Sequence, residues 1–593
     1  MNNVIQQRLT ALRTEMKKLN VDAWYISGTD PHSGEYLPER WKTRAFISGF
    51  TGSYGIVVLT QNETALWTDS RYFLQAAEQL QGTGIEMMKL RVPDAVPPEN
   101  WLALKLPAGS KVGIDTQTLT VSAFRTLQGV LQKKNIKLIE TPDLFERIWE
   151  DRPLIPADKA FGLDVKYAGL SRKEKQDMLA AELASRGAGL HLVTMLDELA
   201  WMYNLRGSDI AYNPVFTGFG IIGADISVLF AESDKLDQTL ALKLENDGVE
   251  IKSYTAFYDY LSELKNNKIW IDPSGLNYLS FSKLTDNNEI LEGTSVISLL
   301  KSRKNATEID GFRKAMKKDG VALVEFLFWL KSMIGNEMIS EYDVGVKLKE
   351  FRAKQEGFQG ESFPPIVGYR EHGAIVHLSV GPDDALPLEA DGILLFDSGG
   401  QYFEGTTDIT RTVALGKVTD QQKEDYTLVL KGMIALSNAV FPYGTKGCNL
   451  DILARQALWN RGMNYGHGTG HGVGHFLNVH EGPMAIRQEL NDNRIEPGNV
   501  MSNEPAFYRE GKYGLRTENM MVCIEKEVTG YGRFLGFETL TLCPVDTTLI
   551  QPELLTTDEK TWLNDYHARV NRELKPFLSE SLHDFLDKLT LPV

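Results

Sequence analysis

Alternating glycines between Gly466 and Gly474 are the feature that most constrains how this chain can fold. They lie in Asn464–Pro483 (NYGHGTGHGVGHFLNVHEGP), which holds four of the ten histidines of the chain. Three of these histidines follow a helical spacing of four residues, but each glycine costs a helix interior about 1 kcal/mol. Glycine instead suits a backbone that passes close to a ligand or an adjacent strand. The stretch therefore predicts closely packed, non-helical backbone with histidines gathered for function.

Two aspartates flank a second constrained segment. Asp391–Asp397 (DGILLFD) predicts a buried strand that ends in a carboxylate, and Thr407–Leu415 (TDITRTVAL) predicts the returning strand. Asp397 and Asp408 lie eleven residues apart, so a hairpin with an enlarged loop brings them side by side. On their own, both suit turn or cap positions equally well.

Two glutamates complete an oxygen-rich set. Pro505 biases Glu504 toward extended backbone, and Glu518 precedes a predicted strand. Either glutamate alone would pass as a solvated charge. Together with His471 and the two aspartates, they suit two divalent cations that share bridging carboxylates better than a single zinc ion. If the five side chains converge, the sequence predicts a hydrolase that activates water between two metals.

The composition bounds the class of protein. A chain of 593 residues is too long for one hydrophobic core, which predicts three or four domains. A formal net charge of −16 without a basic stripe argues against nucleic acid or a membrane as partner. The N-terminus lacks an apolar signal-peptide core, and the apolar runs are too short to span a bilayer. Three cysteines without a C-x-x-C pair favour a cytoplasmic location.

Four parts follow from the pattern along the chain. The first two look like a diverged repeat, because a helix with charged ends (3–19, then 171–186) precedes an apolar strand (Ala23–Ser27, then His191–Met195) in each. A polar segment, KSRKNATE from Lys301, then begins a long helix and a third part. The predicted domains are 1–153, 154–302, 303–545 and 546–593.

The sequence lacks the motifs of several other enzyme classes. Gly218–Gly223 (GFGIIG) matches G-x-G-x-x-G, but a strand-like run rather than a helix follows it, which argues against dinucleotide binding. The sequence has no H-E-x-x-H, G-x-S-x-G or P-loop motif. A zincin, a serine hydrolase and a nucleotide hydrolase are therefore disfavoured.

The five residues resemble, in order and local context, the metal-ligand pattern of the pita-bread metallopeptidases. This family includes methionine aminopeptidase, prolidase, aminopeptidase P and the metal-free creatinase. Within it, the chain most resembles the long, three-domain cytosolic Xaa-Pro aminopeptidases. The resemblance covers nearly the whole length and includes RAFISGFTG (Arg44–Gly52), WTDSRYFLQA (Trp67–Ala76), GSDIAYNPVF (Gly207–Phe216), GAIVH (Gly373–His377), TTDITRT (Thr406–Thr412), GHGTGHGV (Gly466–Val473) and NVHEGP (Asn478–Pro483).

The resemblance implies an α/β (α+β) fold with two creatinase-like N-terminal α/β domains, a pita-bread catalytic domain and a C-terminal extension packed on it. It also implies a metal site. Asp408 and Glu518 would bridge two divalent ions, Asp397 would chelate one, and His471 with Glu504 would complete the other. Manganese is the expected metal, with cobalt and zinc as alternatives.

Further roles come from the same resemblance. His377 and His480 would contact the substrate carbonyl and support the tetrahedral intermediate, and Glu504 would carry the proton to the departing nitrogen. The proline pocket would be lined by His467, Tyr508 and Arg516. His475 departs from the family, since close relatives carry a small residue there. Of two interpretations, a spare polar residue at the surface and a competing ligand, the first is favoured.

The implied activity is that of a metallo-aminopeptidase, in which a hydroxide bridging two metals hydrolyses the N-terminal Xaa-Pro bond of peptides. The expected partners are peptides with proline at the second position and a second copy of the chain. Two alternatives stay open: a prolidase restricted to Xaa-Pro dipeptides, and a non-catalytic binding module. The second is disfavoured because binding modules of this fold lose several ligands, whereas all five are present here.

Overall fold

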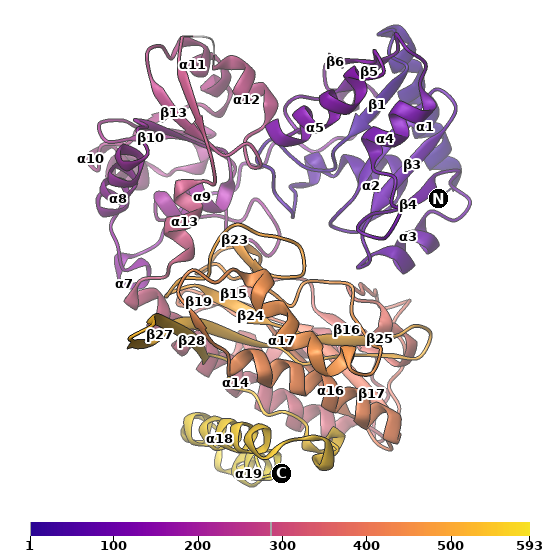
Figure 1. Ribbon diagram of the computed structural model, residues 1–593, viewed down its shortest axis with the longest axis vertical. Helices are drawn as coiled ribbons and strands as arrows, with labels where there is room; N and C mark the ends of the chain where they lie inside the picture. Colours follow the sequence, from indigo (N-terminus) through magenta and orange to yellow (C-terminus); the bar gives the residue numbers. More distant parts are fainter. Residues whose placement is uncertain (1, 285–286) are drawn as a thin grey trace. The chain divides into compact units, whose positions relative to one another are not determined.

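The computed structural model describes residues 2–284 and 287–593, and its internal contacts divide the chain into two compact units (Figure 1). The first unit takes the chain as far as Leu163, together with Leu170–Ala211 and Val215–Leu300. The second unit takes Asp164–Gly169, Tyr212–Pro214 and Lys301–Val593. The second unit is thus built from three separate stretches of the chain.

The first unit contains two six-stranded mixed sheets. The strands of the first sheet are β1 (Ala23–Ile26), β2 (Ile56–Thr60), β3 (Thr64–Thr68), β4 (Glu86–Lys89), β5 (Lys111–Ile114) and β6 (Lys137–Glu140). Those of the second are β8 (Leu190–Val193), β10 (Phe219–Gly223), β11 (Ser227–Phe230), β12 (Glu250–Lys252), β13 (Lys268–Ile271) and β14 (Glu289–Glu292). Because β11 and not a helix follows β10, the glycines of GFGIIG do not form a dinucleotide-binding turn.

The two sheets repeat one topology. Their orders are β4-β3-β2-β1-β5-β6 and β12-β11-β10-β8-β13-β14. In each, the central strand pairs antiparallel with one neighbour and parallel with the other (β2 and β5 for β1; β10 and β13 for β8). A helix also precedes each central strand, α1 (Asn2–Lys18) and α8 (Arg172–Ser185). The shared order is what an internal repeat predicts.

Helices cover both faces of the first sheet, which explains why its central strands are apolar throughout. Val57 and Leu59 of β2 pack with α1, whereas Val58 packs on the opposite face with α4 (Pro98–Lys105) and α5 (Val121–Gln132). Strands buried on both faces read as continuous apolar runs, as IVVLT does.

The second unit holds several small sheets. The strands that matter for the site are β16 (Ile366–Tyr369), β17 (Ile393–Ser398), β20 (Ile409–Ala414), β22 (Gly470–Gly472), β23 (Glu481–Ile486), β24 (Val500–Asn503), β25 (Ala506–Arg509), β26 (Tyr513–Arg516), β27 (Asn519–Thr529) and β28 (Gly532–Thr539). One sheet has the order β16-β17-β20, another runs β21-β28-β27-β24-β22-β23 with β21 (Val440–Pro442) at its edge, and β25 pairs with β26.

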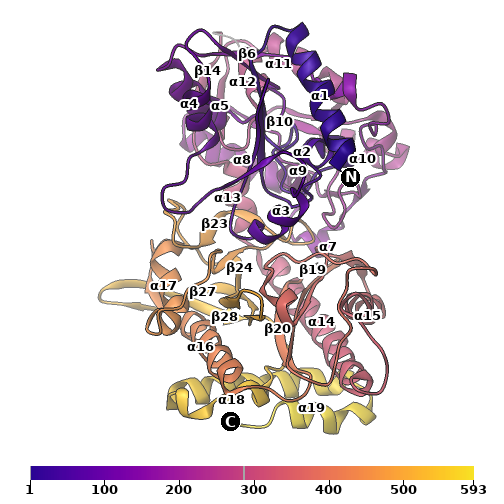
Figure 2. The same ribbon diagram turned by 90° about the vertical axis from the view of Figure 1, so that its right-hand side faces the viewer.

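Helices support these sheets within the same unit. They are α14 (Ala306–Met333), α15 (Glu341–Ala353), α16 (Asp420–Ser437), α17 (Gly447–Trp459), α18 (Thr557–Leu574) and α19 (His583–Leu589). The predicted long helix is α14, which begins at a capping box formed by Asn305 and Glu308. Near the C-terminus, α18 packs against the ends of α14 and α16, as both views show (Figures 1 and 2). Leu563 and Val570 of α18 share a buried core with Val429 and Met433 of α16.

Two short stretches from the earlier part of the chain complete the second unit. Ala168 ends α7 (Val165–Ala168), and its carbonyl accepts a 2.9 Å hydrogen bond from the side-chain amide of Asn305. The carbonyl of Tyr212 accepts one of 3.1 Å from the side-chain amide of Gln401. The α/β (α+β) class predicted from the sequence is confirmed. No helix of the described residues is long and apolar enough to cross a membrane.

Candidate metal centre

Asp397 and Asp408 lie side by side on the predicted hairpin. β17 pairs antiparallel with β20, and Asp397 lies opposite Thr410 in this register. Asp408 immediately precedes β20. The loop is larger than a tight reversal, because β18 (Gly400–Tyr402) and β19 (Gly405–Thr406) form their own small pairing within it. The sequence-based expectation of a hairpin with an enlarged loop is confirmed.

His471 lies on β22, whose backbone packs as close to its neighbours as the glycines predicted. A Cβ at Gly470 would lie 2.1 Å from the carbonyl oxygen of Ser502, and one at Gly472 would lie 2.4 Å from that of Glu481. Only glycine allows β22 to approach its neighbours this closely. Nδ1 of His471 donates to the carbonyl of Gly472 at 2.9 Å, which leaves Nε2 free to act as a ligand.

Nε2 of His471 faces two of the predicted carboxylate ligands. It lies 3.4 Å from Oδ2 of Asp408 and 3.6 Å from Oε1 of Glu504, which sits between β24 and β25. Glu518 lies between β26 and β27. One ligand atom from each of Asp408, His471 and Glu518 falls within 4.8 Å of the others, so these three could hold one ion.

Thr410 joins the two sheets that carry the ligands. The backbone amide of Glu518 donates to the carbonyl of Thr410 at 3.1 Å, and Oγ1 of Thr410 donates to Oε2 of Glu518 at 2.8 Å. Arg411 lies next to it with a buried guanidinium that donates to the carbonyl of Glu518 at 2.5 Å and to Asn519 at 2.8 Å. Sequence reasoning missed both residues. The available signal was a run of polar side chains in the predicted returning strand.

Burial and mutual repulsion act on the carboxylates in the absence of cations. Burial raises the pKa of Asp397 to about 6, although Arg516 opposes the shift. It likewise raises the pKa of Glu504 to about 7 and, together with the charge of Asp408, that of Glu518 well above its usual range. Burial alone would lower the pKa of His471. The hydrogen bond with Asp408 and the charge of Glu504 outweigh this effect and raise the pKa to about 9. The site thus holds more negative charge than its neighbours neutralise.

This donor set fits divalent cations. Four carboxylates and one imidazole form a hard, oxygen-rich site of the kind that manganese prefers. Among the described residues, Oδ1 of Asp397 is buried and accepts no hydrogen bond, so it is available as a ligand. Cations would supply the positive charge that the buried carboxylates otherwise lack.

Three predicted pocket residues form one hydrogen-bonded row that ends at Asp397. Nη2 of Arg516 donates to Oδ2 of Asp397 at 2.7 Å, and Nη1 donates to Oη of Tyr508 at 2.6 Å. Oη of Tyr508 lies 2.9 Å from Nε2 of His467, whose Nδ1 donates to the carbonyl of Gly468. Tyr508 therefore donates to His467. The row fixes the orientation of all three side chains relative to a predicted ligand.

The structure also brings His480 to the centre. Its ring lies 4.4 Å from the ring of His471, edge to face. His377 lies half-buried in the segment between η4 (Arg370–Ala374) and β17. Its contact with the substrate stays a prediction, as do the other roles assigned by resemblance.

The interpretation of His475 as a spare residue at the surface is wrong. Its side chain is buried, with only 2% of the residue exposed, and its ring packs edge to face on Phe312 of α14 at 5.5 Å. Gly311 makes room for it, since a Cβ there would lie 2.9 Å from Nε2 of His475. No residue near His475 in the sequence indicates this contact, because α14 lies more than 140 positions earlier in the chain.

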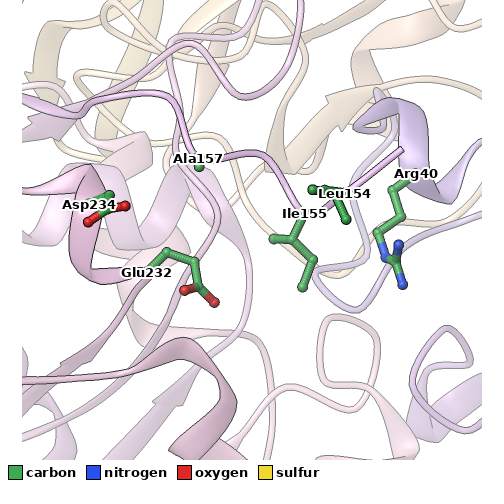
Figure 3. A pocket seen from close by; sticks show the side chains of 6 residues that line it. All are labelled: Arg40, Leu154, Ile155, Ala157, Glu232 and Asp234. Carbon is green, nitrogen blue, oxygen red and sulfur yellow. The ribbon is translucent and has the colours of Figure 1, made fainter. Parts of the chain in front are cut away.

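A separate pocket of about 330 Å³ lies in the first unit (Figure 3). It is lined by Arg40, Leu154, Ile155, Ala157, Glu232 and Asp234. Arg40 is already bound to the carbonyl of Pro153 at 2.8 Å and to Glu146. None of the predicted site residues lines this pocket.

Models of known protein families match successive segments along nearly the whole chain. Models of the creatinase/prolidase N-terminal domain match residues 8–148 and 151–308. The model of metallopeptidase family M24 matches residues 310–525, and that of the C-terminal region of peptidase M24 matches 533–593.

Individual proteins are also similar to this chain over nearly their full length. A probable Xaa-Pro aminopeptidase P of Laccaria bicolor is 41% identical over 96% of this chain and 91% of its own length. Aminopeptidase P1 of Lotus japonicus is 36% identical over 99% of this chain and 100% of its own.

Solved structures show the same fold. An X-prolyl aminopeptidase of Caenorhabditis elegans, a cytosolic enzyme with a di-nuclear active site, is 33% identical and matches with a TM-score of 0.96 over 99% of this chain and 100% of its own. A Xaa-Pro dipeptidase of Bacillus anthracis is 25% identical and matches 63% of this chain with a TM-score of 0.50. The predicted order of creatinase-like and pita-bread domains is confirmed. This chain therefore belongs to the Xaa-Pro aminopeptidase P family of M24 metallopeptidases.

Proposed function

We propose that the protein is a metallo-aminopeptidase that hydrolyses the N-terminal Xaa-Pro bond of peptides and releases the first amino acid. The observation that carries the proposal is the convergence of Asp408, His471 and Glu518, with Glu504 beside them, in a chain that matches this family from end to end. A prolidase is the weaker candidate, because the dipeptidase relative covers only 63% of the chain.

Asp397, Asp408, His471, Glu504 and Glu518 would hold two divalent cations. When bound, such cations lower the pKa of water towards ~7 and polarise the substrate carbonyl. Nε2 of His471 is oriented for this role by the bond from its Nδ1 to Gly472. Manganese is the proposed metal, since carboxylates dominate the donor set.

The side chains around the ligands account for the rest of the chemistry. His480, beside His471, donates a hydrogen bond to the carbonyl oxygen as negative charge develops on it, and His377 assists. Oε1 of Glu504 accepts a proton from the attacking water and passes it to the proline nitrogen, which must be protonated to leave. Because an Xaa-Pro bond is a tertiary amide, recognition relies on a proline pocket rather than on an amide N–H.

The row of His467, Tyr508 and Arg516 forms that pocket in our proposal. Since Arg516 bonds both Tyr508 and Asp397, the pocket and the metal centre are held in one fixed relation. A proline ring held there would place its scissile bond against the reacting groups, which favours reaction by proximity.

Three further properties belong to the same proposal. The chain forms a homodimer and acts in the cytoplasm, as the C. elegans relative is described as cytosolic. The four-part division at 153, 302 and 545 is supported by the matched segments 8–148, 151–308, 310–525 and 533–593. Light scattering on purified protein would test the dimer.

The test of activity uses protein stripped with EDTA and reloaded with manganese, and three peptides. Arg-Pro-Pro should release free arginine, whereas Arg-Ala-Ala should stay intact. Gly-Pro distinguishes the prolidase, because cleavage confined to this dipeptide would replace our proposal with that activity. Failure to cleave any of the three would favour a binding module.

A further inference from the structure

A buried cluster of three charges adjoins His480 in the second unit. Glu481, the next residue, is only 3% exposed. Its Oε2 accepts a 2.6 Å hydrogen bond from Nζ of Lys301, and its Oε1 accepts one from Nζ of Lys304. Both lysines are as buried as the glutamate. We call Lys301, Lys304 and Glu481 the lysine clamp.

The lysine clamp joins two motifs that lie 180 residues apart. The lysines belong to KSRKNATE and the glutamate to NVHEGP. Taking three ions out of water is costly, and short, direct pairing must offset that cost. The carboxylate of Glu308, buried at the start of α14, also attracts the ammonium group of Lys304, so two carboxylates lie near the two lysines. The cluster is therefore compact and close to neutral.

The backbone on both sides of the clamp is fixed too. Glu481 opens β23 and pairs with Gly472 of β22, next to His471. A Cβ at Gly472 would lie 2.4 Å from the carbonyl oxygen of Glu481, so the two strands touch. The backbone amide of Lys304 donates to the carbonyl of Gly498 at 3.0 Å. Glu481 can hardly shift without breaking a strand pair or exposing a buried charge.

We infer that Glu481, held by Lys301 and Lys304, is a positioning residue that fixes His480 against His471 for the reaction. The inference rests on the proposed function, because it assigns Glu481 a task only if His480 meets the substrate. The ring of His480 lies 4.4 Å from that of His471, and the clamp holds the adjoining residue by both its side chain and its backbone. Loss of one lysine should let His480 drift while leaving the metal ligands in place.

Lys304→Met tests this with the least disturbance. It removes one ammonium but keeps the Lys301–Glu481 pair and the backbone bond to Gly498. We expect kcat for Arg-Pro-Pro to fall about 10-fold, since misplacement by ~1 Å can cost up to about 100-fold. KM and metal content should stay normal. Lys304→Arg, which restores a cation, should recover most of kcat.

Lys235→Met is the matched control. Lys235 forms a fully buried ion pair with Asp209 in the first unit, so its loss breaks a comparable pair that belongs to the other unit of the chain. Both variants should melt at a lower temperature than the wild type. Only Lys304→Met should lose kcat per folded molecule.

A crystal structure of metal-free Lys304→Met gives a readout that does not depend on activity. The separation between the rings of His471 and His480 should increase from 4.4 Å, while Asp408, His471 and Glu518 keep their positions. An unchanged ring separation together with an unchanged kcat would overturn the inference and leave the clamp a purely structural feature.

The assay separates this inference from the proposed function. If the wild type does not cleave Arg-Pro-Pro, the proposed function fails and kcat carries no information on the clamp. If the wild type cleaves it and Lys304→Met matches the wild type, the clamp inference alone fails.

Discussion

The carboxylate cluster of the metal centre and the Asp319–Arg352 pair are both buried in the second unit, but their charges are matched differently. Both oxygens of Asp319 on α14 are bonded, to Nε and Nη2 of Arg352 on α15 at 2.7 and 3.1 Å and to Tyr402 at 3.0 Å. At the metal centre, four carboxylates face one arginine and one histidine, and Oδ1 of Asp397 accepts no hydrogen bond from the described part of the chain. A buried ion pair whose charges balance supports the fold, whereas the excess negative charge of the carboxylate cluster suits the binding of cations.

Glu518→Gln should break the metal centre most completely. The amide keeps the size of the side chain and can still accept the bond from Thr410, but it removes one negative charge from the ligand set. We expect activity to fall on the order of 1,000-fold or more, with a loss of bound metal. Peptide cleavage and metal analysis of the purified variant would measure both. Glu510→Gln, on the surface, serves as the control, and full activity of Glu518→Gln would contradict the assignment of Glu518 as a ligand.

Arg352→Met should break the matched pair instead. Removing one partner of a buried pair costs roughly 3–5 kcal/mol, because the remaining charge stays buried. Chemical denaturation should show this loss, while metal content per folded molecule stays normal. The double variant Asp319→Leu/Arg352→Met should be less destabilised than the single one. Selective loss of metal in Arg352→Met would show that this pair serves the site and not only the fold.

His480→Ala should separate a substrate contact from a ligand. Loss of one donor to a developing oxyanion lowers kcat by about 100-fold or more, or roughly 3 kcal/mol. Metal content should remain that of the wild type, since the predicted ligands are untouched. Steady-state kinetics with parallel metal analysis would decide. If metal falls in step with kcat, His480 is itself a ligand.

Removal of the metals should make stability depend on pH in a defined direction. In the metal-free fold, the pKa of Asp397 is about 6 and that of Glu504 about 7, both above their ordinary values near 4. Groups with a raised folded pKa keep the fold stable at low pH, and this contribution is lost as pH rises from about 4 to 7. The melting temperature of stripped protein should therefore fall across this range by several degrees relative to loaded protein. Parallel melting curves for the two forms would contradict the shifts.

His475→Ala should have the smallest effect and act on packing. Deleting a buried ring against Phe312 leaves a cavity, with a cost of about 2 kcal/mol in unfolding free energy. Metal content and kcat should stay near those of the wild type. Calorimetry and metal analysis distinguish the two interpretations. Loss of metal in this variant would revive His475 as a ligand.

Local patterns predicted what lies close in sequence. The hairpin of β17 and β20 followed from an apolar run and a returning run, and the close backbone packing around His471 followed from the glycines. The repeated topology of the first unit was visible as two helix–strand beginnings.

Contacts between residues far apart in the sequence could not be predicted from local patterns. The burial of His475 depends on Gly311, and the pairing of Glu481 depends on two lysines 177 and 180 positions away. Neither residue carries a local sign of its neighbour, because packing across elements leaves no periodicity in one sequence. The family resemblance supplied the order of domains but not these contacts.

Because the second unit is built from three separate stretches of the chain, its gene cannot be cut at one point without losing part of the unit. It draws Asp164–Gly169 and Tyr212–Pro214 from stretches that otherwise belong to the first unit, and Asn305 and Gln401 bond to them. A gene fragment that starts at Lys301 would encode every predicted metal ligand yet omit nine residues of the unit that holds them. Recombination that keeps this unit intact must therefore retain the two backbone carbonyls to which Asn305 and Gln401 donate.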